Sequence, residues 1–286
     1  GEGLLPINGL LSAQSATRLG AEVDSQMHIC QAAVASGEPV FKHFAEVLTP
    51  SAGLRSDLKL ELSPVVQAAL HEALGTLAPL LGALLGADAN LWELAALSSD
   101  PGAVQQDVHP DTCWEPELTA LVVFVALHDM NHAMGPTVVL PQTHTQSAHA
   151  AFNGGKCGSR YALLCGTSHR VPCPRCGDAL LIDSRVLHCG GANRSTRRRT
   201  LFYFTFLRSG MAPKLRRSSI LERLRDRCRL DDTARWLSVD GIADVLARSP
   251  EEGESVKERK RSLKYMTHEE LLGASEDEHG SDCLPQ

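Results

Sequence analysis

The sequence predicts a mainly β fold with flanking α-helices, in which the strands pair as a sandwich or jelly roll. Between about residues 91 and 208, short apolar or β-branched runs are separated by Gly, Pro, Asn and Asp, as in strands joined by turns. No helical pattern lies between these runs, so an alternating β-α arrangement is not expected. Two apolar patterns with helical spacing precede them. We therefore expect helices packed beside two sheets that enclose a small-molecule pocket.

Two helices are predicted before the strands. Ser12 is a suitable N-cap for the first helix, and Gly37 can end it. Apolar residues in this segment recur every three or four positions, as in a helix with one face in the core. Ser63 and Pro64 supply an N-cap and a first-turn proline for the second helix, which Pro79 is expected to break or kink. Both helices are interpreted as packing elements without chemistry of their own.

Four runs have the length of strands and are bounded by turn residues. They lie at residues 118–127, 137–140, 179–182 and 201–206. We expect a single jelly-roll domain over residues 1–210 with its core strands at about 91–208. Beyond Gly210 an arginine-rich segment at 214–228 is expected to be helical, and the charged residues after Ser249 bury too little apolar surface to order. Residues 211–286 are therefore predicted to be a helical and partly disordered C-terminal extension.

Composition restricts the class of partner. A formal charge of −6 over 286 residues gives no electrostatic reason to bind nucleic acid or an anionic membrane. The longest apolar stretch, residues 118–127, is about half of the roughly 20 residues that a membrane-spanning helix needs. Nine cysteines, an odd number spread unevenly, indicate reduced thiols and a cytoplasmic location, although a chain beginning at Gly1 leaves a removed targeting segment open. We expect a small-molecule partner, no nucleic acid and no membrane insertion.

The segment around His109 and Asp111 carries the strongest functional signal. In an extended chain, residues two apart point to the same side, so both side chains can reach one ion. His188 follows the strand expected at 179–182 by a short loop, which places it at a strand end. Two imidazoles and one carboxylate form the facial ligand set of non-haem Fe(II), which leaves positions open for a co-substrate and dioxygen. Because His-x-Asp alone is a weak motif, the interpretation depends on the sequence around both halves.

The surrounding residues resemble the phytanoyl-CoA dioxygenase family. His188 opens a Gly-rich stretch that ends in Asn193-Arg194-Ser195, and arginines follow at the start of the next strand. Residues 135–144 are similar to the family's Gly-x-x-x-x-x-Pro-Gly-Ser-His segment. Pro101-Gly102 and Gln106 upstream of the first ligand, and Gly177-Asp178 before the last metal strand, extend the similarity. It spans roughly residues 90 to 208.

The resemblance implies a double-stranded β-helix (jelly roll, cupin-like) core and an Fe(II)- and 2-oxoglutarate-dependent dioxygenase. Such an enzyme hydroxylates a small-molecule or lipid-like substrate while dioxygen decarboxylates 2-oxoglutarate to succinate, with ascorbate as a supporting reductant. The implied catalytic metal ligands are His109, Asp111 and His188. Relatives that halogenate carry a small residue in place of the ligand carboxylate, whereas Asp111 is present here. Hydroxylation is therefore the expected reaction.

The resemblance also implies how 2-oxoglutarate binds. The family spacing selects Arg199 for its distal carboxylate, because a guanidinium matches a carboxylate with two parallel hydrogen bonds. Arg197 would share the same side of the strand and is the alternative if the register slips. Gln106 is expected to assist. Relatives commonly have a serine where Gly190 stands, so neighbouring groups must replace its hydroxyl.

Two other classes of function remain open. One is a non-catalytic jelly-roll binding protein that keeps the metal as a structural element. The other is a different metal-dependent jelly-roll activity, such as an isomerase or a dioxygenase that needs no co-acid, in which Arg199 would have no such task. Cys173 and Cys176 have the spacing of a zinc site, but no second Cys-x-x-Cys exists, so incidental thiols are favoured over a structural zinc.

The substrate pocket is harder to derive from the sequence. Trp114, Gln106 and Val122 are candidate lining residues because they lie near the first ligand pair. Arg55 and Asp57 lie in a polar stretch before the second helix, where they either reach the pocket mouth or form a surface salt bridge.

Overall fold

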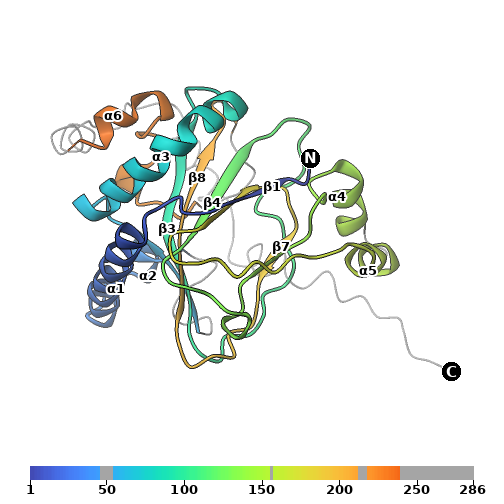
Figure 1. Ribbon diagram of the computed structural model, residues 1–286, viewed down its shortest axis with the longest axis horizontal. Coiled ribbons are helices and arrows are strands. Elements are labelled where there is room, and N and C mark those ends of the chain that lie inside the picture. The colour runs from blue at the N-terminus through green and yellow to red at the C-terminus, as the bar shows by residue number, and fades with distance from the viewer. Residues whose placement is uncertain (46–53, 155–156, 212–217, 239–286) are drawn as a thin grey trace, which may run out of the picture. The chain divides into compact units, whose positions relative to one another are not determined.

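Two antiparallel sheets form the centre of the protein, whose computed structural model describes residues 1–45, 54–154, 157–211 and 218–238. The large sheet has the strand order β1-β6-β4-β8-β3-β2, and the small sheet pairs β5 with β7 (Figure 1). The large sheet comprises β1 (Leu4–Ile7), β2 (Arg55–Lys59), β3 (Asn90–Ser99), β4 (Ala120–Ala126), β6 (Ala179–Asp183) and β8 (Arg199–Leu207). The small sheet comprises β5 (Thr137–Val139) and β7 (His188–Gly190). The predicted mainly β class with flanking helices is confirmed.

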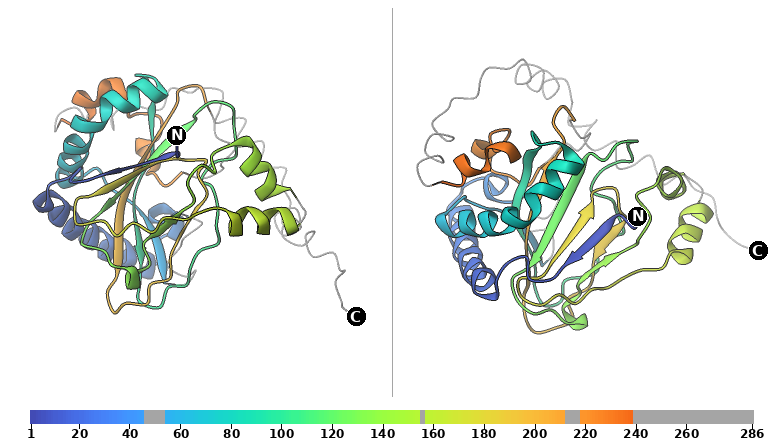
Figure 2. Two further views of the ribbon diagram at one scale, coloured as in Figure 1. Left: turned by 45° about the vertical axis from the view of Figure 1, so that its right-hand side comes forward. Right: turned by 45° about the horizontal axis from the view of Figure 1, so that its top comes forward.

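Two long helices cover one face of the large sheet, and the small sheet lies on the other side (Figure 2). These helices are α1 (Ala13–Ala35) and α3 (Pro64–Leu85). The shorter helices are α2 (Val40–His43), α4 (Gln146–Asn153), α5 (Cys157–Gly166) and α6 (Thr233–Trp236), with 3-10 turns at His132–Met134, Glu222–Leu224 and Leu230–Asp232. Space for a site is therefore left between the two sheets rather than under the helices.

Strand alternation gives the large sheet two different faces. On β8, Phe204 and its alternate neighbours point toward α1 and α3, while Tyr203 and Thr205 point to the other side. The helix-facing residues form one buried cluster, the helix-side core, in which each large side chain contributes about 1.5–3 kcal/mol to folding. This cluster includes Leu58, Leu70, Leu94, Val123, Phe202, Phe204 and Phe206. The opposite face is free to carry polar groups.

The predicted helices are confirmed, with one correction. Ser12 Oγ accepts the N–H of Ser15 at 3.2 Å and so caps α1, and Ser63 is the N-cap of α3. The expectation that Pro79 breaks α3 is wrong, because the helix continues to Leu85. Buried leucines on both sides of the proline hold the helix against the core and compensate for its missing hydrogen bond. They include Leu70, Leu74, Leu77, Leu81 and Leu85.

The four predicted strand runs overlap β4, β5, β6 and β8, whereas β1, β2, β3 and β7 are not among the predicted runs. The helix expected at 214–228 is wrong for its described part, since residues 218–228 contain only the 3-10 turn Glu222–Leu224. Residues 212–217 and 239–286, with most of the predicted extension, lie outside the described residues. Apolar side chains of the described part nevertheless join the helix-side core. They are Ile220, Leu221, Leu224, Cys228, Leu230 and Trp236.

Helix α3 is long and apolar enough, by length and composition, to cross a membrane. In this fold its apolar stripe is used for packing, because Val66, Leu70, Leu77 and Leu81 are all buried in the helix-side core. These contacts are those of the core helix of a globular domain.

Gly177 is required where the chain turns beside the start of α1. Its φ is +90°, and a Cβ atom would lie 2.1 Å from the carbonyl oxygen of Leu11. We expect Gly177→Ala to lower the free energy of unfolding by more than about 1 kcal/mol, because it adds backbone strain to a steric overlap. Chemical denaturation measures this. Gly75→Ala on the exposed side of α3, where no atom lies within 4 Å, should instead stabilise by about 0.5–1 kcal/mol; equal effects of the two substitutions would contradict the argument.

Candidate active site

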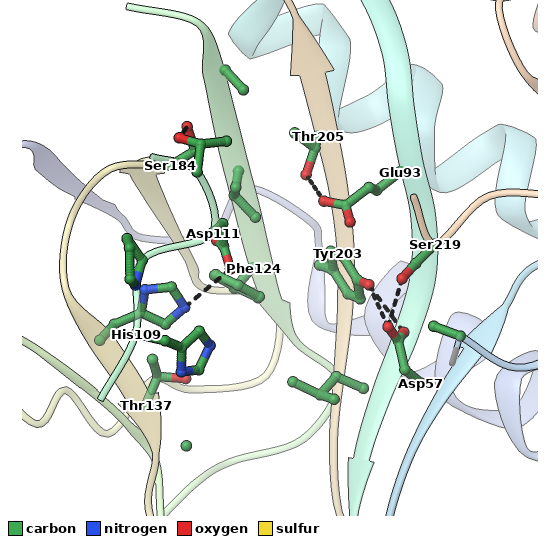
Figure 3. A pocket seen from close by; sticks show the side chains of 18 of the residues that line it. Asp57, Glu93, His109, Asp111, Phe124, Thr137, Ser184, Tyr203, Thr205 and Ser219 are labelled. Carbon is green, nitrogen blue, oxygen red and sulfur yellow. Dashed lines mark hydrogen bonds and ion pairs between the residues drawn. The ribbon is translucent and has the colours of Figure 1, made fainter. Parts of the chain in front are cut away.

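His109, Asp111 and His188 lie together between the sheets. The N–H groups of His109 and His188 each donate to the other's carbonyl oxygen at 2.9 Å, and their ring centroids are 4.7 Å apart. Asp111 Oδ1 lies 3.5 Å from His188 Nε2. One ligand atom from each of the three residues lies within 4.8 Å of the others, the grouping that a single metal ion needs. His109 and Asp111 project toward the same place (Figure 3).

The hydrogen bonds of both imidazoles suit metal binding. His109 Nδ1 lies 2.7 Å from the carbonyl oxygen of Asp107, and His188 Nδ1 lies 2.9 Å from that of Val186. A carbonyl oxygen only accepts, so each Nδ1 carries the proton and each Nε2 keeps its lone pair. Burial, followed by the neighbouring His188, lowers the pKa of His109 and favours the neutral form that coordinates a metal.

The carboxylate also fits a cation. Asp111 Oδ2 is buried and has no hydrogen-bond partner. A buried carboxylate oxygen without a partner is costly, and a divalent cation at this position would satisfy it. With two imidazole nitrogens and one carboxylate oxygen, the donor set matches the facial Fe(II) site.

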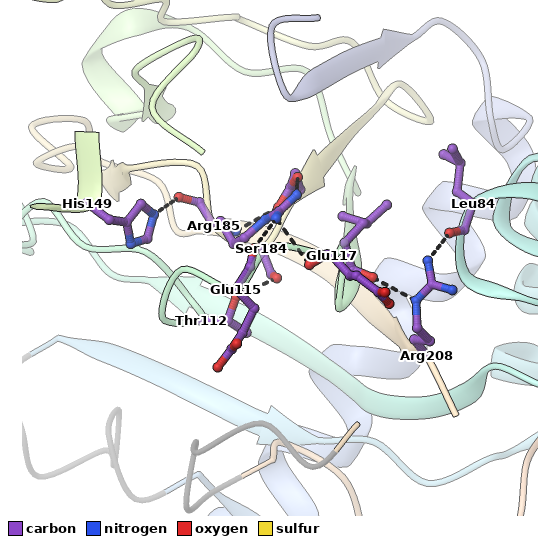
Figure 4. A network of polar contacts seen from close by, with 10 residues as sticks. Leu84, Thr112, Glu115, Glu117, His149, Ser184, Arg185 and Arg208 are labelled. Carbon is purple, nitrogen blue, oxygen red and sulfur yellow. Dashed lines mark hydrogen bonds and ion pairs between the residues drawn. The ribbon is translucent and has the colours of Figure 1, made fainter. Parts of the chain in front are cut away.

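A network centred on Arg185 fixes the two ligand-bearing loops relative to each other (Figure 4). Its guanidinium donates to both oxygens of Asp183 at 2.9 and 2.6 Å and to the carbonyl of Glu115 at 2.6 Å. The carbonyl oxygen of Ser184 accepts the N–H of Asp111 at 2.9 Å. The hydroxyl groups of Ser184 and Thr112 lie 2.7 Å apart. The loop before His188 is thus joined to the segment that carries Asp111.

A cavity of about 270 Å³ adjoins the three ligands and separates them from the large sheet. Gln106 and Val122 line it, as predicted, but Trp114 does not. Its floor on the large sheet consists of side chains from the face opposite the helix-side core. These include Leu97, Val122, Phe124, Tyr203 and Thr205.

Two buried arginines meet beside one end of this cavity. Arg199, at the start of β8, donates to Ser99 Oγ at 3.1 Å and to the carbonyl of Gly135, and Arg55 donates to the same Ser99 Oγ at 2.5 Å. Burial, followed by the charge of Arg55, lowers the pKa of Arg199 to about 10. Among the described residues no carboxylate pairs with either guanidinium. Arg197, the alternative considered from the sequence, is exposed.

Gly190 forms the cavity wall in front of these arginines. A Cβ atom there would lie 2.5 Å from Gln106 Oε1, 2.8 Å from Arg55 Nη1 and 3.3 Å from Arg199 Nη2. Gln106 Oε1 accepts the N–H of Gly190 at 2.8 Å. Only glycine therefore allows both guanidinium groups and the amide to approach the cavity edge.

The opposite wall carries two carboxyl groups, Asp57 on β2 and Glu93 on β3 (Figure 3). Glu93 and Thr205 are direct partners across β3 and β8, so their side chains share the cavity face. Burial, followed by the charge of Asp111, raises the pKa of Glu93 from 4.5 to about 8. Burial raises the pKa of Asp57 from 3.8 to about 6 against the opposing hydrogen bonds from Ser219 and Tyr203. From the sequence alone, Asp57 either reaches the pocket mouth or forms a surface salt bridge, and Glu93 is not singled out.

Cys173 and Cys176 do not approach the triad. Cys173 Sγ lies 3.5 Å from His132 Nδ1, whereas Cys176 Sγ contacts the carbonyl of Leu127 at 3.3 Å. Within the described ranges, His109, Asp111 and His188 are the one set of three or more ligand residues that converge.

Comparison with known proteins agrees with this geometry. The profile of the family described as phytanoyl-CoA dioxygenase matches residues 1–201. The chain belongs to the phytanoyl-CoA dioxygenase family. This membership and the converged His-Asp-His group confirm the prediction of a non-haem iron, 2-oxoglutarate-dependent oxygenase. No curated protein matches the chain.

Solved structures show the same fold at low identity. AviO1 from Streptomyces viridochromogenes Tue57 has a TM-score of 0.56 at 17% identity, covering 74% of this chain and 92% of its own. HygX from Streptomyces hygroscopicus, crystallised with nickel and 2-oxoglutarate, has a TM-score of 0.54 at 15% identity over 74% and 85%. The carbocyclase SnoK from nogalamycin biosynthesis has 0.51 at 18% over 72% and 79%. The jelly-roll core predicted for this family member is confirmed.

The raised pKa of Glu93 makes the stability of the metal-free protein depend on pH. Below pH 4.5 the folded and unfolded states are both protonated, but between pH 4.5 and about 8 only the unfolded state loses the proton, so folding is increasingly penalised. We expect Glu93→Gln to stabilise by about 2–4 kcal/mol at pH 8 and hardly at all near pH 4.5. Denaturation at both pH values measures this. Glu117→Gln, at an exposed position, is the control; a pH-independent effect of Glu93→Gln would contradict the assignment.

Proposed function

We propose that this family member hydroxylates a small molecule, with His109, Asp111 and His188 as the Fe(II) ligands. The observation that carries the proposal is the convergence of one oxygen and two nitrogen donors beside a cavity. The ligand carboxylate is present, so no position on the iron is left for a halide in place of Asp111. The overall reaction is R–H + O₂ + 2-oxoglutarate giving R–OH, succinate and CO₂.

When bound, Fe(II) and 2-oxoglutarate supply the activation of dioxygen. The chain's own residues orient and enclose the reactants. Backbone carbonyls hold both imidazoles with Nε2 toward the ion, and the Ser184 carbonyl positions Asp111. Phe124 and Val122 place apolar surface between the metal site and the large sheet, which excludes water from the reacting C–H bond.

We infer that 2-oxoglutarate binds with its distal carboxylate toward Arg199. Neither guanidinium group has a carboxylate partner among the described residues, so the pair is a local excess of positive charge there, and an anion would relieve their mutual repulsion. Arg199 Nε is buried without a hydrogen-bond partner, so the group has capacity left for a ligand. Arg55 and Gln106 stand beside Gly190, where relatives commonly have a serine hydroxyl, and would complete the contact.

The metal ligands are tested by metal binding and turnover together. We expect His109→Ala and Asp111→Ala to weaken Ni(II) binding by at least a hundredfold and to abolish Fe(II)-dependent succinate formation, because each removes one of three ligands. Calorimetry and succinate analysis measure the two effects. His28→Ala on the exposed face of α1 is the matched control. Turnover equal to that of the wild type in either ligand variant would rule out this site, and metal binding without any succinate would favour the non-catalytic alternative.

The two candidate arginines form a natural pair for testing co-substrate binding. Arg199→Lys keeps the charge but loses the two-pronged geometry, so we expect the Kd of 2-oxoglutarate to rise at least tenfold in the metal-loaded protein. Arg197→Lys at the exposed position should change the Kd by less than twofold. Calorimetric titration with 2-oxoglutarate measures both. A larger effect at Arg197 would mean that the assignment of the anchor is wrong.

A further inference from the structure

The cavity wall opposite the metal triad carries two carboxyl groups that have no cationic partner among the described residues. Asp57 and Glu93 both line this wall (Figure 3). No lysine, arginine or histidine of the described residues forms a salt bridge with either carboxyl group. Lys59 is near enough to favour ionised Asp57, but its ammonium group donates to the carbonyl of Phe41 at 2.8 Å. Buried carboxyl groups normally have a charged partner, so the missing cation is a feature of the site.

Neutral hydroxyl groups hold both carboxyl groups in fixed orientations. Tyr203 Oη donates to the two oxygens of Asp57 at 3.0 and 2.8 Å, and Ser219 Oγ donates to Asp57 Oδ2 at 2.6 Å. Thr205 Oγ1 donates to Glu93 Oε2 at 2.6 Å. Hydroxyl donors orient a carboxyl group but supply no positive charge, so a cation entering the cavity would meet two oriented oxygen acceptors and would favour their ionised forms.

A β-bulge brings Trp92 into the lining of the same cavity. The register of β3 against β8 shifts between Leu91 and Glu93, so that Trp92 is the extra residue. Neighbouring residues of a regular strand point to opposite faces, yet Trp92 and Glu93 both line the cavity. An indole ring beside carboxyl groups is the combination that binds an ammonium group through cation–π and ionic attraction.

We propose that the wall formed by Asp57, Glu93 and Trp92 binds a protonated amine of the substrate, so that the enzyme oxidises a small amine-bearing molecule. The inference rests on the proposed function of the same cavity and names its substrate class. A phosphate-bearing thioester would be repelled by ionised carboxyl groups on this wall, and a lipid chain would offer neither group a cationic partner. A cation supplies the charge that neither the hydroxyl donors nor the described residues around the wall provide.

Three probes of similar size but different charge test the proposal: cyclohexylamine, cyclohexanol and cyclohexanecarboxylate. Each is titrated into protein loaded with Ni(II) and 2-oxoglutarate, and into metal-free protein, with binding followed by ligand-observed NMR. We expect the amine to bind at least tenfold more tightly than the alcohol, and the carboxylate less tightly than the alcohol. Glu93→Gln and Asp57→Asn should each weaken amine binding at least tenfold while changing alcohol binding by less than twofold. Glu117→Gln, which removes one exposed charge, should change none of the three.

The proposal is overturned if the amine binds no more tightly than the alcohol, including the case in which none of the probes binds. It is also overturned if the amine preference persists in both Glu93→Gln and Asp57→Asn. Unchanged binding of Ni(II) and 2-oxoglutarate shows that each variant is folded. Amine preference in the metal-free protein without succinate formation would contradict the proposed function alone, whereas succinate formation without amine preference would contradict the substrate class alone.

Discussion

The geometry of the site depends on one pair of backbone hydrogen bonds, which joins His109 to His188. Because main-chain groups form both bonds, at 2.9 Å each, the two imidazoles are adjacent whatever rotamers their side chains adopt. Hydrogen bonds from Asp111 and Thr112 to the carbonyl of Ser184 then fix the carboxylate-bearing segment. Each bond contributes only about 0.5–1.5 kcal/mol net, so the site depends on several acting together. The three proposed ligands, which come from two distant segments of the chain, are thereby arranged before any ion binds.

Basic groups lie at one end of the cavity and carboxyl groups at the other, and strand β2 contributes one residue to each end. Arg55 and Asp57 are two apart on β2 and therefore point to the same side of the sheet. Arg55 pairs with Ser99 of β3 and reaches the Gly190 end, whereas Asp57 pairs with Leu97 and reaches the wall opposite the metal ligands. Buried charges that are held apart destabilise the fold unless ligands of opposite charge pair with them. A co-substrate anion at the arginine end and a substrate cation at the carboxyl end would be the two ligands that pair with these groups.

The sequence predicted that His109, Asp111 and His188 would come together, but it predicted the opposite wall poorly, and both outcomes have the same physical cause. His109 and Asp111 could be found because two-residue spacing in an extended segment directly determines which side chains converge. Strand β2 was missed because its residues Arg55–Lys59 contain a single apolar side chain, and apolar alternation is the signal by which strands are recognised. Asp57 on this strand faces a cavity instead of solvent, which the sequence alone does not distinguish. The bulge at Trp92 likewise depends on pairing with β8, a long-range property.

Gly190 shows why a departure from the family pattern need not weaken the site. A serine at this position would place its side chain where Gln106 Oε1 and Arg55 Nη1 already lie, 2.5 and 2.8 Å from the Cβ position. Arg55 itself is fixed by the carbonyls of Val104 and Gly191, each 2.7 Å from its Nη2. Its remaining amino group points past the glycine, and a guanidinium binds a carboxylate more strongly than a hydroxyl does. The loss of the serine hydroxyl and the presence of buried Arg55 are therefore best understood as one change. The guanidinium of Arg55, the stronger donor, occupies the space that Gly190 leaves.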